Sequence, residues 1–122
     1  MDVVLTGFEE TWQPDGSKLL HLPFVGQAIG DLFTGDVQPG AADDQIHREG
    51  KMESACADYV IAGRDFAGKP CTVHVVNRNR DGMWKPTVTT DSEALAFLNG
   101  ADCTAVLELR LMGPIVHILT KR

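Results

Sequence analysis

Three polar side chains recur at every second position after a Pro-Gly turn, namely Asp43, Gln45 and His47. If the chain is extended there, all three share one face, because side chains of a strand alternate between two faces. A carboxylate, an amide and an imidazole on one surface can bind the polar edge of a ligand and move a proton. We therefore predict a ligand-binding site at these residues, with Asp43 and His47 as its candidate catalytic groups.

The turn before these residues would fix their position. Pro39 restricts φ to about −65° and Gly40 accepts a positive φ, which together favour a type II turn. The small side chains of Ala41 and Ala42 let other groups approach the backbone closely. A purely structural interpretation stays open, in which Asp43 caps the turn and His47 is a solvated strand residue. The two interpretations are compatible, since a fixed turn also positions an acid.

Further candidates lie on other predicted strands. Asp58 and Tyr59 are neighbours, so they point to opposite faces and one of them should look into the interior. We expect both to contribute to ligand binding, with Asp58 as a second candidate for an acid in a cavity. His21 lies in an apolar extended segment and could also face a cavity. His74 and His117 lie between apolar residues and are expected to be satisfied or outward-facing.

Cofactor and metal chemistry find little support in the sequence. Asp43, Asp44 and His47 are possible ligands, but no H-x-H, HExxH or cysteine-pair motif accompanies them. The glycine spacing lacks the strand–helix context of phosphate-binding loops. The three cysteines have no CxxC spacing and are expected to be reduced, mostly buried thiols. We therefore expect neither a cofactor nor a bound metal.

The net charge and the length of the chain limit the partners and the cellular location that we expect for it. The chain has 122 residues, a net charge of −6 and a pI near 5.0, which argue against nucleic-acid and anionic-membrane partners. No apolar run approaches the ~20 residues of a membrane helix. The N-terminus lacks the basic and apolar regions of a signal peptide, so we expect a cytoplasmic protein.

The elements that must position the site are short strands punctuated by glycine and proline. Segment 104–112 alternates apolar and polar residues, as a half-buried antiparallel strand does. One short helix is expected at 91–98, and a polar loop at 77–82. The other predicted strands are 3–8, 18–24, 52–61, 71–77 and 115–120, and predicted turns fall at 13–16, 48–51 and 63–70. Trp12 and Trp84 fall in loop-like contexts.

This pattern predicts an all-β fold, a single domain spanning 1–122. About eight or nine short strands with one short helix near 91–98 favour an antiparallel β-barrel, or else a sandwich. The barrel is preferred because Gly26, Gly30 and Gly35 recur within strands, where sharp bends occur.

Two segments resemble domain-of-unknown-function family 3237, also called uncharacterised protein family 0311. Gly35-Asp-Val-Gln-Pro-Gly-Ala-Ala-Asp-Asp-Gln45 is similar to its G-x-V-x-P-G-G-A-D-x-Q motif. Ala57-Asp-Tyr59 and the segment 75–79 are similar to its A-x-Y and N-R-G motifs. The resemblance implies a small calycin-like β-barrel, often bacterial and of unassigned role. Some fungal members look like cyclases of natural-product pathways.

The chain departs from this family pattern at the site. Ala41 replaces the second glycine of the turn, Asp44 replaces an aromatic residue, and Asp58 replaces a basic one. If the family site relies on that cation, this protein has changed the charge of the site and its ligand.

Three functions follow from these observations. The preferred one is a barrel that binds an organic small molecule in its mouth or cavity without catalysis. The alternative is an acid–base enzyme, such as a cyclase, isomerase or hydratase, that uses Asp43. The third is a self-associating structural protein, for instance a homodimer.

Overall fold

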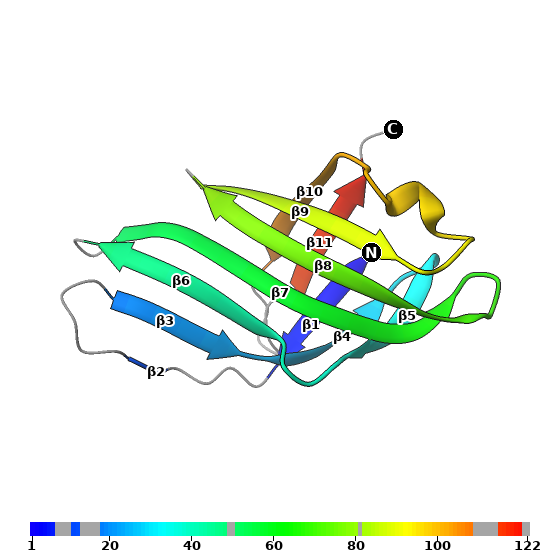
Figure 1. Ribbon diagram of the computed structural model, residues 1–122, viewed down its shortest axis with the longest axis horizontal. Helices are drawn as coiled ribbons and strands as arrows, with labels where there is room; N and C mark the ends of the chain where they lie inside the picture. The colour runs from blue at the N-terminus through cyan, green and yellow to red at the C-terminus, as the bar shows by residue number, and fades with distance from the viewer. Residues whose placement is uncertain (7–10, 13–17, 49–50, 81, 109–114, 121–122) are drawn as a thin grey trace.

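The structure is a computed structural model that describes residues 1–6, 11–12, 18–48, 51–80, 82–108 and 115–120. The all-β prediction is confirmed, because this part of the chain forms one antiparallel sheet of eleven strands (Figure 1). The Gly-rich segment contributes two strands, so the number exceeds the eight or nine expected. The elements are β1 (Asp2–Thr6), β2 (Thr11–Trp12), β3 (Lys18–Pro23), β4 (Val25–Ile29), β5 (Phe33–Val37), β6 (Ala42–Arg48), β7 (Lys51–Asp65), β8 (Pro70–Arg80), β9 (Met83–Thr90), the 3₁₀ turn η1 (Ala96–Leu98), β10 (Cys103–Glu108) and β11 (Ile115–Thr120).

Strand β7 organises the sheet because it is paired along both of its edges. One edge pairs with β8 from Ser54 to Arg64. The other edge pairs first with β6 and then with β5, which lie end to end along it. The turn at residues 38–41 makes this possible: Gly40 has a φ of 96°, and the Gln38 amide donates to the Val60 carbonyl at 2.7 Å.

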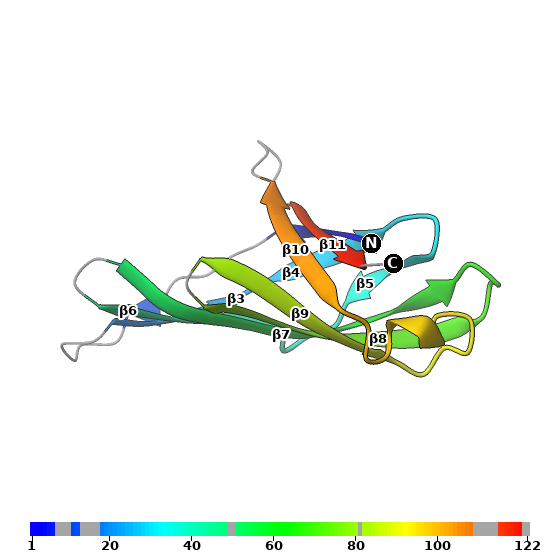
Figure 2. The same cartoon turned by 90° about the horizontal axis from the view of Figure 1, so that it is seen from above.

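The sheet curls into a half-barrel. Strands β10, β11, β1, β4 and β5 follow one another and lie over one part of the long strands. Figure 2 shows β3, β6 and the adjoining ends of β7, β8 and β9 extending beyond this curled part. We call this extension the ribbon. The chain leaves the ribbon at Phe24 and re-enters it at Ala42. The Phe24 amide donates to the Ala41 carbonyl at 3.1 Å.

The apolar core fills the concave face of the curled part. Val3, Ile61, Val73, Val75, Val88 and Leu95 are its fully buried side chains. Along β8 the burial alternates strictly, so the odd-numbered side chains point inward. The inward positions change from Val73 and Val75 in the core to Asn77 and Asn79 in the ribbon. The concave face therefore becomes polar where the ribbon begins.

Two predictions of secondary structure were wrong. Residues 77–80 are not a loop but the end of β8, because the Asn and Arg side chains continue the alternation of the strand. Residues 91–98 hold only the turn η1. Polar side chains tie this segment to the sheet instead: Asp91 accepts from the Thr72 amide at 2.8 Å, and Asn99 from the Thr90 amide at 2.8 Å. Among the described residues, no helix is long and apolar enough to cross a membrane.

The predicted turn at 13–16, the centre of the one at 48–51 and the end of the strand predicted at 104–112 lie outside the described residues. The 63–70 turn region is shorter than expected, since β7 continues to Asp65.

Close backbone approach explains two of the glycines within strands. Gly35 on β5 pairs with Gly63 on β7. A Cβ atom on Gly63 would lie 1.9 Å from the Thr34 carbonyl oxygen, which is far inside contact distance. Only glycine fits there, and this tight pairing brings the curled part against β7.

Candidate functional site

The residues from the Pro-Gly turn onward lie on a strand rather than on a loop. β6 begins at Ala42, so Asp43 and Asp44 point to opposite faces of the sheet. Asp43 is half-buried and Asp44 is exposed. The sheet therefore divides the two acids between two different surfaces.

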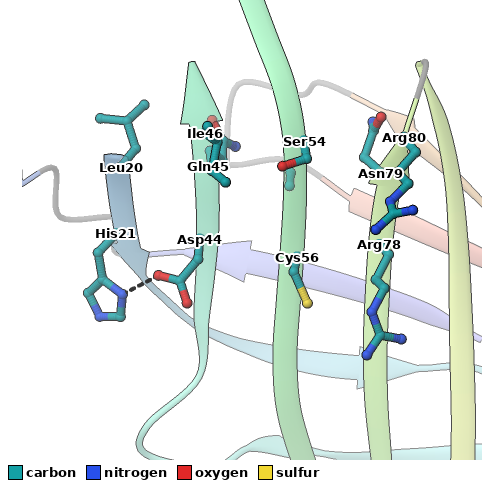
Figure 3. A pocket seen from close by; sticks show the side chains of 11 residues that line it. Leu20, His21, Asp44, Gln45, Ile46, Ser54, Cys56, Arg78, Asn79 and Arg80 are labelled. Atoms are coloured by element: carbon teal, nitrogen blue, oxygen red, sulfur yellow. Dashed lines mark hydrogen bonds and ion pairs between the residues drawn. The ribbon is translucent and has the colours of Figure 1, made fainter. Parts of the chain in front are cut away.

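The outer face holds Asp44 together with His21 and Asp58. His21 Nδ1 lies 2.5 Å from Asp44 Oδ1, at the edge of an outer groove (Figure 3). His74 Nε2 lies 2.6 Å from Asp58 Oδ1 on the same face. His21 lines the outer groove, and Asp58, expected as a second acid in a cavity, is exposed on this face and does not point into the interior. The strand register turns Tyr59 inward, and therefore turns Asp58 toward solvent.

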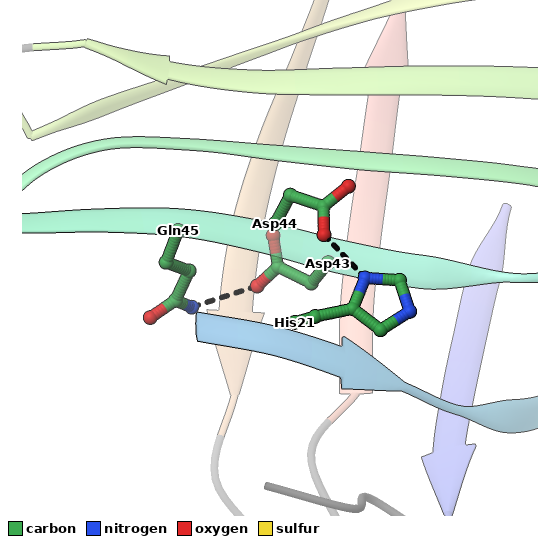
Figure 4. Close-up of polar contacts among 4 residues, drawn as sticks. All are labelled: His21, Asp43, Asp44 and Gln45. Carbon is green, nitrogen blue, oxygen red and sulfur yellow. Dashed lines mark hydrogen bonds and ion pairs between the residues drawn. The ribbon is translucent and has the colours of Figure 1, made fainter. Parts of the chain in front are cut away.

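The inner face joins Asp43, Gln45 and His47 in a chain of hydrogen bonds. Gln45 Nε2 donates to Asp43 Oδ2 at 2.7 Å (Figure 4). Gln45 Oε1 lies 2.9 Å from His47 Nε2. Since an amide oxygen can only accept, the imidazole carries its proton on Nε2 in this contact. The shared face follows from the period-two alternation, as the sequence predicted.

Burial raises the pKa of the Asp43 carboxyl above its ordinary value. The hydrogen bond from Gln45 lowers this pKa in part, and the charge of Asp44 raises it further. The neutral acid is favoured relative to a solvated aspartate. A neutral carboxyl can donate a hydrogen bond as well as accept one.

Asp43 stands in one row with Ala57 and Asn77. Asp43 pairs with Ala57 across β6 and β7, and Ala57 pairs with Asn77 across β7 and β8. Neighbouring strands are about 4.8 Å apart, so the Cα atoms of the two polar residues are separated by roughly 10 Å. The side chain between them is a single methyl group. Ala57 is partly exposed, whereas Asp43 Oδ1 and Asn77 Oδ1 on either side of it are buried.

Tyr59 lies on the same face, two residues along β7. Its side chain is 4 % exposed, and its ring meets that of Phe24 edge to face at a centroid distance of 5.2 Å. Burial raises the pKa of the phenol, so the group stays protonated at all ordinary pH values. Tyr59 therefore presents a hydroxyl group at the boundary between the core and the ribbon.

Three buried polar atoms of this region have no hydrogen-bond partner among the described residues: Asp43 Oδ1, Tyr59 Oη and Asn77 Oδ1. We call these three residues the inner-face cluster. Buried polar atoms are nearly always paired, and an unpaired one costs on the order of 1–3 kcal/mol. Asp43 and Asn77 stand on either side of Ala57 in one register row, and Tyr59 follows Ala57 by two residues on the same face of β7.

Asn77 was not among the residues predicted for the site. Asn77 continues the inward positions of Cys71, Val73 and Val75, so extending the alternation by one step would have found it. Trp84 was expected in a loop but lies on β9, opposite Asn79. The side chain of Trp12 lies outside the described residues. No group of three or more potential ligands in the described part of the chain could hold a metal ion.

The cysteines are free, with Cys71 and Cys103 buried and Cys56 partly exposed. Burial raises the pKa of the Cys71 and Cys103 thiols, which disfavours the reactive thiolate. His117 meets Asp2 at 2.8 Å. These residues therefore have structural surroundings outside the inner-face cluster.

No protein-family model and no curated protein matches the chain. Solved structures do resemble it. A Clostridium acetobutylicum protein of unknown function is 16% identical with a TM-score of 0.70, covering 99% of this chain and 94% of its own. A beta-barrel like protein from Acinetobacter baumannii is 14% identical with a TM-score of 0.69 (98% and 92% covered). A protein of unknown function from Rhodopseudomonas palustris is 14% identical with a TM-score of 0.64 (98% and 91%). The chain thus has the fold of small β-barrel-like proteins.

Proposed function

We propose that the inner-face cluster binds an organic small molecule where the core meets the ribbon. The observation that carries the proposal is the set of unpaired buried atoms on Asp43, Tyr59 and Asn77. A ligand that pairs with them would recover the free energy that their burial costs. Binding sites are typically built this way, from a few convergent polar groups beside an apolar wall.

The chemistry of the three atoms defines the class of ligand. Asn77 Oδ1 only accepts, so the ligand must carry at least one N–H or O–H group. Tyr59 can donate or accept. A neutral, polar organic molecule with a hydroxyl, amide or amine group meets these requirements, and the half-buried surroundings of Asp43 disfavour an anion.

Acid–base catalysis by Asp43 is the second candidate function. The raised pKa of Asp43 supports it, since an acid is most effective when its pKa approaches the working pH. The hydrogen bonds through Gln45 to His47 would hold the carboxyl in place during proton transfer. Under this proposal Asp43 transfers the proton, and Gln45 and His47 orient it.

We also propose that the chain belongs near domain-of-unknown-function family 3237. The support is the resemblance of residues 35–45 and 57–59, together with the β-barrel-like fold. The Asp58 departure falls on the outer face, so it leaves the inner-face cluster unaltered.

The test is a thermal-shift screen of neutral metabolites on the wild type, Tyr59→Phe, Asp43→Asn and Asp44→Asn. At one hundred times its Kd, a ligand stabilises the protein by about 2.7 kcal/mol. We expect a hit to stabilise the wild type and Asp44→Asn, and to bind Tyr59→Phe and Asp43→Asn about threefold to tenfold more weakly.

The outcomes separate the candidate functions. Turnover of a hit by the wild type that is lost in Asp43→Asn, at a concentration of the hit that saturates both proteins, would establish the enzyme. A screen in which no compound distinguishes the inner variants from Asp44→Asn would overturn the binding proposal. Melting that depends on protein concentration would instead favour self-association.

A further inference from the structure

The outer face of the ribbon carries a groove of about 530 Å³, across strands β3, β6, β7 and β8. Asp44, Cys56 and Arg78 lie in one register row, and Figure 3 shows their side chains on three neighbouring strands. Ile46, Ser54 and Arg80 form the next outward row. Ser54 and Cys56 occupy the middle of the two rows, and their small side chains form the floor of the groove.

The two arginines provide an anion-binding wall. Arg78 and Arg80 are exposed and lie two residues apart on the same face of β8, so their Cα atoms are about 7 Å apart. Neither guanidinium makes an ion pair or a hydrogen bond within the described residues. The acids on the same face have histidine partners, Asp44 with His21 and Asp58 with His74. The groove is thus lined by two arginines and one carboxylate, that of Asp44, in a protein of net charge −6.

Apolar side chains flank the arginines. Ile46 is 36 % exposed, and Met83, which pairs with Arg80 across β9, is 60 % exposed. Both lie in the outward row, on either side of Ser54 and Arg80. Guanidinium groups bind carboxylates through paired hydrogen bonds, and the neighbouring apolar side chains can contact a hydrocarbon group. The groove therefore fits an organic acid with an apolar part better than an inorganic ion.

We propose that this groove is a second binding site, for a small organic acid with an apolar chain or ring. Its carboxylate binds Arg78 and Arg80, and its apolar part covers Ile46 and the low floor at Ser54 and Cys56. The site is on the opposite face of the sheet from the inner-face cluster and is independent of the function proposed for that cluster.

The test uses sodium acetate, hexanoate and octanoate at constant ionic strength, followed by amide chemical shifts of the whole protein. We expect saturable shifts around Arg78 and Arg80, with affinity rising about threefold to tenfold from hexanoate to octanoate. The double variant Arg78→Gln/Arg80→Gln should bind octanoate at least about tenfold more weakly. Lys69→Gln, which removes one positive charge at the far end of the β7–β8 hairpin, should bind as the wild type does.

Cys56 gives a second readout. It is the partly exposed cysteine, so iodoacetamide labelling should be slowed by octanoate in the wild type but not in the double arginine variant. Tyr59→Phe and Asp43→Asn should leave octanoate binding unchanged, which separates this site from the inner one. Absence of saturation, equal binding by the double arginine variant and Lys69→Gln, or shifts centred on Ala57 would each overturn the proposal.

Discussion

Two acids on the concave face of the sheet have opposite surroundings. Asp65 ends β7 and is 6 % exposed; its Oδ1 accepts from the amides of Ala67 at 2.9 Å and Lys69 at 3.1 Å, and its Oδ2 accepts from Ser92 Oγ at 2.6 Å. Asp43 has one hydrogen bond from Gln45 and one buried oxygen with no partner among the described residues.

The pKa shifts of the two acids follow from these surroundings. The hydrogen bond from Ser92 is the largest cause of the lowered pKa of Asp65, followed by burial, which opposes it, and by the two backbone hydrogen bonds. Burial dominates at Asp43 and raises its pKa. Both carboxylate oxygens of Asp65 accept hydrogen bonds from other residues of the chain, and two of these bonds close the turn that follows β7. Asp43 retains one carboxyl oxygen that no described residue of the chain bonds, and an outside molecule could use it.

The largest expected effect concerns the tightly packed end of β7, near Asp65. Gly63→Ala should reduce the free energy of unfolding by about 3 kcal/mol or more, because the new Cβ meets backbone atoms that cannot move aside. Denaturant unfolding measures this loss. Gly30→Ala is the matched control, since its nearest contact is an ordinary 3.8 Å, and it should change stability little. Equal losses in both variants would contradict the distinction.

Ser92→Ala should be the next most damaging change. Ser92 Oγ donates to Asp65 and accepts from the Leu95 amide at 3.2 Å, so alanine leaves buried groups on both sides unpaired. We expect a loss of about 1–3 kcal/mol in denaturant unfolding. Ser54→Ala, on the outer face, should cost much less. A Ser92→Ala protein as stable as the wild type would show that Asp65 does not depend on this bond.

The two acids should affect stability with opposite signs as pH changes. An unfolded aspartate has a pKa of about 3.9. The lowered pKa of folded Asp65 stabilises the protein above that value, and this contribution is lost as the pH falls through the folded pKa. The raised pKa of Asp43 does the reverse: its penalty grows as the pH rises from about 3.9 through the folded pKa, and it is complete above.

Melting temperatures from acid to neutral pH test these signs. At neutral pH, Asp65→Asn should melt below the wild type and Asp43→Asn at or above it. Both differences should shrink toward acid pH, as both wild-type carboxyls become protonated. An Asp43→Asn variant that melts well below the wild type at neutral pH would mean that Asp43 is a structural acid like Asp65.

The smallest expected effect is at Tyr59. Tyr59→Phe removes a hydroxyl without a partner in the described residues, so the empty protein should keep its stability or gain up to about 1 kcal/mol. Thermal unfolding measures the change. A loss above about 1 kcal/mol would show that the hydroxyl is already bonded within the protein. The chain has one tyrosine, so ultraviolet titration of the wild type reports directly whether its phenol stays protonated.

Part of this architecture could be predicted from the spacing of residues along the sequence alone. The period-two spacing of Asp43, Gln45 and His47 correctly predicted one shared face, because alternation is a property of any strand. The positive φ of Gly40 likewise followed from the Pro-Gly pair. These inferences needed no knowledge of which strands are neighbours.

Other features depend on pairing between distant strands. Whether Asp58 or Tyr59 faces inward is decided by the register of β7 against β6 and β8, which neighbouring residues cannot reveal. Asn77 resembles a loop residue because its neighbours are polar, yet pairing on both edges of β8 keeps the segment extended. At 91–98, where a helix was expected, Asp91 instead accepts a hydrogen bond from Thr72 on β8, which is 19 residues earlier in the sequence.

The pairing of β1 with β11 has a consequence for the order of folding. It sets Asp2 opposite His117, so closing this part of the sheet joins residues 115 positions apart. The β7–β8 hairpin needs only the short turn after Asp65. Because distant contacts carry a larger loop-closure cost, we expect β7 and β8 amides to gain exchange protection before those of β1 and β11. The strands that carry Tyr59 and Asn77 would then be assembled before the half-barrel beside them.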